Sequence, residues 1–143
     1  MIVIKNSYLV ELAYPSAAAA GSQITFKDAQ FLEKVLIVGI EIITADQMST
    51  APSGNAMASK ANAIKGALTI VEGNKDKLFQ LPNGQLITQD NAGIVKEFSP
   101  IKLNLSKCSV VMFAAGIAAN ESLCFNFYYI YPEDLANYLK NKK

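Results

Sequence analysis

The chain has 143 residues, of which 51% are apolar, and its lysines and acidic residues nearly balance to a net charge of +1. It contains no histidine, arginine or tryptophan. Without histidine there is no side chain that ordinarily titrates near neutral pH, and no imidazole metal ligand. Without arginine there is no guanidinium group, which can bind phosphate or carboxylate through two parallel hydrogen bonds. The commonest catalytic and nucleic-acid-reading groups are therefore excluded.

Only 17% of the residues are charged, against roughly a quarter in ordinary soluble domains. A surface with few charges and almost no net charge offers little repulsion against association. The length suits one domain with a substantial core. We therefore expect a single domain over residues 1–143 whose apolar surface is partly covered by other subunits.

Short apolar and β-branched runs separated by turn residues predict strands along most of the chain. The predicted strands, in chain order, are Tyr8–Leu12, Gln23–Phe26, Val35–Thr44, Ala67–Val71, Leu78–Leu81, Gln85–Thr88, Ile101–Leu105, Val110–Ala115 and Leu123–Tyr131.

Two of these strands are long enough to show which face is buried. In Val35–Thr44 both alternating sets are apolar apart from Glu41, which predicts a strand that is covered on both sides or lies centrally in a sheet. Its predicted faces are Leu36, Val38, Ile40 and Ile42 on one side and Val35, Ile37, Gly39, Glu41 and Ile43 on the other. The last strand carries a period-two aromatic stripe, which is typical of a core face. The stripe consists of Leu123, Phe125, Phe127, Tyr129 and Tyr131.

Turn chemistry favours antiparallel connections. Asn83-Gly84 lies between two short apolar pairs and predicts a tight hairpin. No stretch of 10 to 15 helical residues separates successive strands, so parallel βαβ units are not expected. The fold class predicted is all-β: an antiparallel β-sandwich, as a jelly roll, with a short C-terminal helix. A barrel is the alternative.

Three segments fall outside the strand pattern. Residues 1–21 are expected to form an N-terminal arm that includes the first strand, and residues 45–66 an insertion loop with a short helix at Ala56–Lys65. The insertion either reaches a neighbouring molecule or is a loose surface loop. In the C-terminal segment, 132–143, Pro132, Glu133 and Asp134 suit a helix start. That segment is expected to form an amphipathic helix and a lysine tail, packed on its own sandwich or on an adjacent subunit.

Targeting signals are weak. Glu11 interrupts the apolar part of the N-terminus, so a secretory leader is not expected, and no apolar run approaches the length of a membrane-spanning helix. Cys108 and Cys124 are assigned to successive antiparallel strands, where a cross-strand disulfide is conceivable. We expect them to be reduced and buried instead.

A search for chemistry finds no catalytic, cofactor-binding or metal-ligating set. Ser59-Lys60 is a chance neighbour pair rather than an activated nucleophile, because no supporting base accompanies it. Glu41 is the one acid inside an apolar strand, and an outward-facing position is the preferred interpretation over a hydrolase carboxylate. The lysines are scattered, so specific nucleic-acid binding is not expected.

The arm, the insertion after the third strand, the low charge and the aromatic last strand together resemble the small jelly-roll structural proteins of bacteriophage particles. The resemblance implies a non-enzymatic capsid, penton or decoration protein located in the virion, with copies of itself and other virion proteins as partners. It transfers no functional residue. The alternative is a cytoplasmic ligand- or carbohydrate-binding sandwich that uses Tyr128, Tyr129 and Tyr131 as stacking platforms. A hydrolase acting through Glu41 is a third hypothesis.

Overall fold

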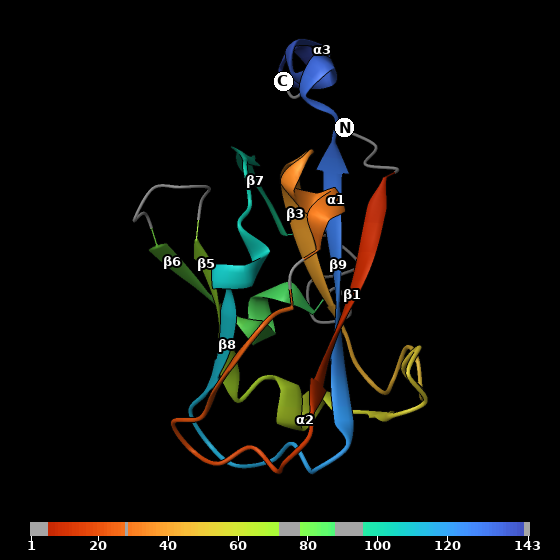
Figure 1. Ribbon diagram of the computed structural model, residues 1–143, viewed down its shortest axis with the longest axis vertical. Helices are drawn as coiled ribbons and strands as arrows, with labels where there is room; N and C mark the ends of the chain where they lie inside the picture. Colours follow the sequence, from red (N-terminus) through yellow and green to blue (C-terminus); the bar gives the residue numbers. More distant parts are fainter. Residues whose placement is uncertain (1–5, 28, 72–77, 88–95, 142–143) are drawn as a thin grey trace.

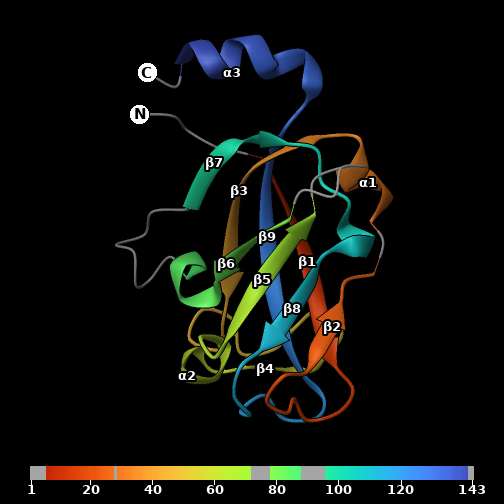
Figure 2. The same ribbon diagram turned by 90° about the vertical axis from the view of Figure 1, so that its left-hand side faces the viewer.

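Two antiparallel sheets pack face to face in the computed structural model, which describes residues 6–27, 29–71, 78–87 and 96–141 (Figures 1 and 2). The strands are β1 (Ser7–Tyr14), β2 (Gln23–Thr25), β3 (Leu36–Ile43), β4 (Ala56–Met57), β5 (Gly66–Val71), β6 (Leu78–Pro82), β7 (Lys96–Ile101), β8 (Ser109–Met112) and β9 (Glu121–Ile130). The helices are α1 (Gln30–Glu33), α2 (Lys60–Ala63) and α3 (Leu135–Asn141), with 3₁₀ turns at Asn83–Leu86, Leu105–Lys107 and Pro132–Asp134.

The strand pairing confirms the predicted jelly roll. The first sheet, here sheet A, has the order β1-β9-β3-β7, and the second, sheet B, has the order β2-β8-β5-β6. Leaving aside the two-residue β4, the first strand pairs with the last, the second with the second-to-last, the third with β7, and β5 with β6, all antiparallel. This nesting is what a long hairpin produces when it is rolled into two layers.

The core lies between the sheets and is filled by the inward side of each strand. In β9, Leu123, Phe125 and Phe127 are fully buried, which confirms most of the predicted aromatic stripe. The ring of Phe26 meets that of Phe125 edge to face, with centroids 5.1 Å apart. Opposite them, Leu68 and Ile70 of β5 belong to the same cluster. Period-two burial therefore holds for the strands that dominate both layers.

A β-bulge changes the predicted faces of β3. Its pairing with β9 shifts in register between Ile37 and Gly39, so one extra residue is accommodated there. As a result Ile37 lies in the core with Ile40 and Ile42, whereas strict alternation places it on the opposite face. Glu41 still points outward, but β3 is an inner strand, between β9 and β7, rather than an edge.

The predicted Asn-Gly hairpin is wrong. Residues Asn83–Leu86 form a 3₁₀ turn, and Ile87 is buried without belonging to a strand; residue 88 lies outside the described part. Asn83 is fully buried and its side-chain amide donates a hydrogen bond to the carbonyl of Ala63 at 2.9 Å. A tertiary hydrogen bond thus holds Asn83 in the interior, whereas the turn residues of a β-hairpin usually lie at the surface.

Two strand boundaries also differ from those predicted. The strand expected at Ile101–Leu105 is β7, which ends at Ile101; Leu103 and Leu105 enter the core from the connecting segment. The strand expected at Val110–Ala115 ends at Met112, because Phe113 turns outward and its backbone N–H bonds the carbonyl of Lys65. The apolar pattern extended both predicted strands beyond the residues that the structure includes in β7 and β8.

The insertion packs on the outer face of sheet A. Ala51 and Met57 form a small buried cluster with Cys124, and β4 pairs in parallel with the start of β9. The predicted helix at Ala56–Lys65 shrinks to α2, because Ala56–Met57 is a strand instead. Within the segment expected as an N-terminal arm, residues 7–14 form β1 and are paired with β9 along their whole length.

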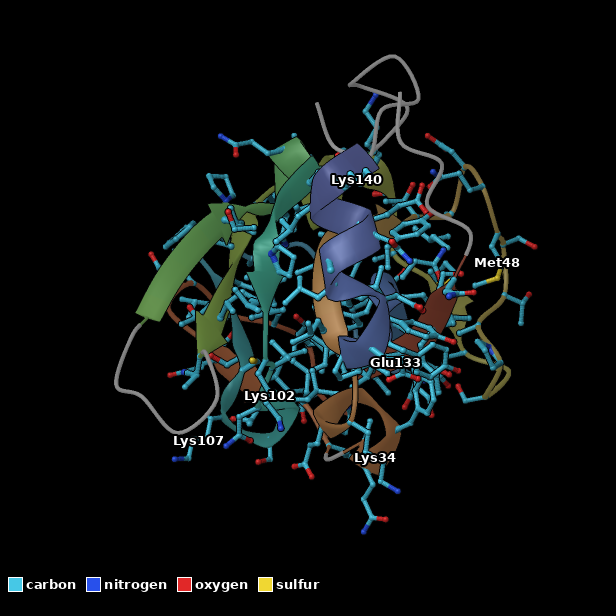
Figure 3. All side chains as sticks on the ribbon, turned by 90° about the horizontal axis from the view of Figure 1, so that it is seen from above. Lys34, Met48, Lys102, Lys107, Glu133 and Lys140 are labelled. Atoms are coloured by element: carbon cyan, nitrogen blue, oxygen red, sulfur yellow. The ribbon has the colours of Figure 1, made fainter. Side chains whose placement is uncertain are left out.

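The C-terminal helix lies across one end of the sandwich (Figures 1 and 2). Seen from that end, α3 passes over the end of β3 (Figure 3). Tyr138 is buried, whereas Leu139 remains half exposed, so the apolar side of the predicted amphipathic helix, which consists of Leu135, Tyr138 and Leu139, is only partly covered.

Replacing Phe125 with alanine should destabilise the fold strongly, because the ring is fully buried between the sheets. We expect a loss of about 3–5 kcal/mol in the free energy of unfolding, measured by denaturant titration. Phe113→Ala is the matched control: that ring is 62% exposed, and its loss should change stability by no more than about 0.5 kcal/mol. Equal losses in the two variants would contradict the assigned core.

Candidate interaction site

The outer edge of sheet A is formed by β1, whose backbone is paired on one side only. The carbonyl of Asn6 accepts a hydrogen bond from the N–H of Tyr129 in β9. The carbonyl of Tyr14 accepts one from the N–H of Asn120, the residue just before β9. Because backbone direction alternates along an antiparallel strand, the even-numbered residues of β1 face β9. The N–H and C=O groups of Ser7, Leu9 and Glu11 therefore point away from the sheet.

β1 lacks most of the features that protect edge strands from pairing with another chain. It has eight residues, pairs with β9 without a register shift, and contains neither proline nor lysine. The other three edges differ: β2 has three residues, β6 ends in Pro82, and β7 contains Pro100 and pairs with β3 across a register shift. Short length, proline and bulges are the usual means of blocking an edge. Among the described strands, β1 is the edge that remains open.

Glu11 is the one charged side chain of β1, and it is held from the outer face. Its carboxylate accepts hydrogen bonds from the backbone and hydroxyl of Ser53 and from the hydroxyl of Ser122, the latter at 2.7 Å. The side-chain amide of Asn55 donates a hydrogen bond to the hydroxyl of Ser122, so Glu11, Ser53, Asn55 and Ser122 form one hydrogen-bonded network. Partial burial raises the pKa of Glu11, but the hydrogen bonds outweigh it and the net pKa is below its ordinary value. Hydrogen bonds from the insertion and from β9 thus hold the ionised side chain of Glu11 against the outer face of sheet A.

A cleft of about 520 Å³ opens where the edges of the two sheets meet. Its walls come from the end of β1, from β2, from the insertion and from the residue before β9. The residues lining it are Glu11, Leu12, Ala13, Tyr14, Pro15, Ile24, Thr25, Lys27, Ser53, Asn55 and Asn120. One carboxylate, one ammonium group and several amide and hydroxyl groups share the cleft with an apolar floor. This mixture suits a small polar ligand with both donors and acceptors.

Four aromatic rings form a chain at the end of the sandwich nearest α3. Tyr8 stacks on Phe31 at 5.2 Å, Phe31 meets Tyr129 edge to face at 5.1 Å, and Tyr129 meets Tyr131 at 5.7 Å. Tyr8 is 38% exposed and Tyr131 40% exposed. We call these four rings the aromatic surface; Leu9 is also exposed, but it points to the opposite face of sheet A, because side chains alternate along β1. Phe31, on the unpredicted helix α1, links β1 to the end of β9.

The tyrosines predicted as stacking platforms do not share one surface. Tyr128 points to the outer face, where its hydroxyl donates to Glu41 at 2.9 Å, and Asn126 donates to the same oxygen at 3.1 Å. Burial first, and then the bond to Glu41, raise the pKa of Tyr128 to about 12. Tyr129 and Tyr131 lie in the aromatic surface. The structure therefore brings Glu41 together with Tyr128 and separates both from the cleft.

Neither cysteine is positioned for a disulfide. Cys108 precedes β8 in sheet B and Cys124 lies on β9 in sheet A, so the predicted neighbouring strands are in different layers. Both thiols are free and fully buried. Burial, and after it the nearby charge of Glu11, raise the pKa of Cys124 to about 11, so this thiol is protonated at neutral pH.

Ser59 begins the short helix α2. It is the N-cap of α2, and its hydroxyl accepts a hydrogen bond from the backbone of Asn62.

The part of the chain that the structure describes contains neither a cluster of potential metal ligands nor a membrane-spanning helix. No three histidine, cysteine or acidic side chains gather there as potential metal ligands. Its helices are also too short to cross a membrane.

Lys34, Lys102 and Lys107 extend on the same side of the molecule (Figure 3), whereas Met48 of the insertion lies beyond sheet A.

Comparison with known proteins adds no relative: no family model matches the chain, and no curated protein or solved structure matches it. Function therefore has to be argued from the edge, the cleft and the aromatic surface. The sequence does not reveal the edge or the cleft, because each joins segments far apart in the chain, and it indicates only Tyr129 and Tyr131 of the aromatic surface. Glu11 is the other sequence signal near these features, as the acid that interrupts an apolar stretch.

Glu11→Gln should reduce stability in a pH-dependent way. Because the folded-state pKa of Glu11 is lowered, its stabilising effect is present above the ordinary value of 4.5 and is lost as the pH falls through the folded-state value. We expect the difference in free energy of unfolding between wild type and variant to be largest near neutral pH and to shrink in acid. Glu33→Gln, on the exposed side of α1, is the control and should show no such trend. A pH-independent difference for Glu11→Gln would contradict the assigned network.

Proposed function

We propose that this protein is a non-enzymatic structural subunit of a viral particle, of the bacteriophage kind, that assembles as a symmetric homo-oligomer. The aromatic surface is the observation that carries this proposal. Contiguous exposed apolar patches on an otherwise folded domain are typical of surfaces that another protein covers. Aromatic residues are also enriched at the centres of such interfaces.

Two further features support assembly. The low charge leaves little electrostatic repulsion between copies. The jelly roll is a common fold of viral capsid domains, although lectins and cupins share it, so the fold alone supports the class by analogy. The missing histidine and arginine favour a structural role over a catalytic one.

Self-association should depend on the aromatic surface. We expect the wild-type protein to be oligomeric at tens of micromolar concentration, measured by size-exclusion chromatography with light scattering. Tyr131→Asp should shift it toward monomer, because a charge would have to be buried in the contact. Phe113→Asp, which changes an even more exposed ring at the other end of the sandwich, should leave the oligomer intact. A wild-type monomer at high micromolar concentration would contradict the proposal.

The cleft favours a second candidate function, the binding of a small hydroxyl-rich ligand such as a saccharide. The carboxylate of Glu11 and the amides of Asn55 and Asn120 are groups that bind sugar hydroxyls, and the volume lies in the usual range for ligand sites. The candidate carbohydrate site is therefore the cleft between β1 and β2, in place of Tyr128, Tyr129 and Tyr131.

Thermal-shift measurements with a panel of mono- and disaccharides test the second candidate. A ligand that binds the folded state should raise the melting temperature in a concentration-dependent way. The shift should be smaller in Glu11→Gln than in Glu33→Gln, since only the first alters the cleft. Absence of any shift at millimolar saccharide would rule this candidate out.

A further inference from the structure

The open edge of β1 has a self-complementary pattern. Its upper half, Ser7 to Glu11, is more exposed than its lower half, which lines the cleft. Ser7, Leu9 and Glu11 all direct backbone donors and acceptors outward, so a second strand can add to them with regular antiparallel hydrogen bonds. The question is which strand fits.

We propose that β1 pairs antiparallel with β1 of a second copy about a two-fold axis at Leu9, joining the two A sheets into one. This inference rests on the proposed assembly and specifies the contact between copies. A two-fold contact uses the same patch on both molecules and closes without leading to open fibres. It would also cover the edge that the fold leaves unprotected.

The side chains on the outer face select the register. An axis at Glu11 would place two carboxylates opposite each other, which is unfavourable. An axis at Val10 would set the apolar Leu9 against Glu11 of the second copy. An axis at Leu9 pairs leucine with leucine and places Ser7, a hydroxyl donor, opposite Glu11. It also centres the contact on residues 7–11, the exposed half of the strand.

The remaining edges do not offer an equal partner. A three-residue strand and two strands containing proline cannot supply an uninterrupted ladder of this length. Tyr8 directly precedes Leu9 in β1 and carries its exposed ring on the opposite face of the sheet, so pairing at β1 would bring the Tyr8 ends of the two aromatic surfaces near the same axis. Strand pairing and apolar burial would then act together.

Cysteine cross-linking tests this register directly. Opposed residues of a hydrogen-bonded antiparallel pair have Cα atoms about 5.5 Å apart, within the range that a disulfide spans. We expect Leu9→Cys to form a covalent dimer under mild oxidation, seen on non-reducing gels. The wild-type protein should not, since both native cysteines are buried. Ala13→Cys is the matched control: it lies on the same strand and face and is exposed, but in the proposed register the two copies of residue 13 lie far apart on opposite sides of the axis.

A second variant guards against a folding artefact. Leu9→Lys adds a like-charged pair at the axis and should weaken self-association by about tenfold or more. Because Leu9 is 38% exposed, the melting temperature of the Leu9→Lys variant at low protein concentration should stay near that of the wild type. An oligomeric wild type whose Leu9→Cys variant forms no dimer, or cross-links no better than Ala13→Cys, would overturn the β1 pairing and leave the proposed function standing. A monomeric wild type would overturn both.

Discussion

The structure depends on the pairing of the first strand with the last. β9 has β1 on one side and β3 on the other, and its inner face supplies the rings of Phe125 and Phe127 to the core. The second strand pairs with β8 and the third with β7, so the pairing is nested inward from the two ends of the chain. This nested order is that of a jelly roll, and it leaves one edge of sheet A open, because β1 has no further neighbour among the described strands.

The outer surface divides into parts with different roles. The insertion covers the lower part of sheet A and binds Glu11, which keeps the only charge of β1 engaged on the sheet face. The upper part of β1 stays exposed and continues into Tyr8, Phe31 and Tyr131. Protection on three edges and exposure on the fourth is an asymmetry that a subunit with one preferred neighbour would need.

Much of the fold could be predicted from local pattern. Period-two stripes are a local property, so β1, β5 and β9 were placed well, and the two-layer class followed from them. The bulge at Ile37 could not be predicted, because it reflects the fit of β3 against β9 and not the composition of β3. Asn83 was misjudged for a related reason: its partner, Ala63, is twenty residues away.

The candidate site was much less predictable than the fold. The carboxylate of Glu11 meets hydroxyls 42 and 111 residues further along the chain. The aromatic surface needs Phe31, which sits on a four-residue helix too short to leave a helical pattern. Which edge is open depends on the order of strands in the sheets, and strand order is a property of the whole chain.

Amide hydrogen exchange along β1 tests the central claim most directly, namely that this strand is bound to β9 on one side and open to a second copy on the other. In dilute protein, the amides of Tyr8 and Val10 should be protected and those of Leu9 and Glu11 should exchange rapidly. At concentrations where the protein associates, Leu9 and Glu11 should become protected as well. Equal exchange at all four residues, unchanged by concentration, would contradict the account.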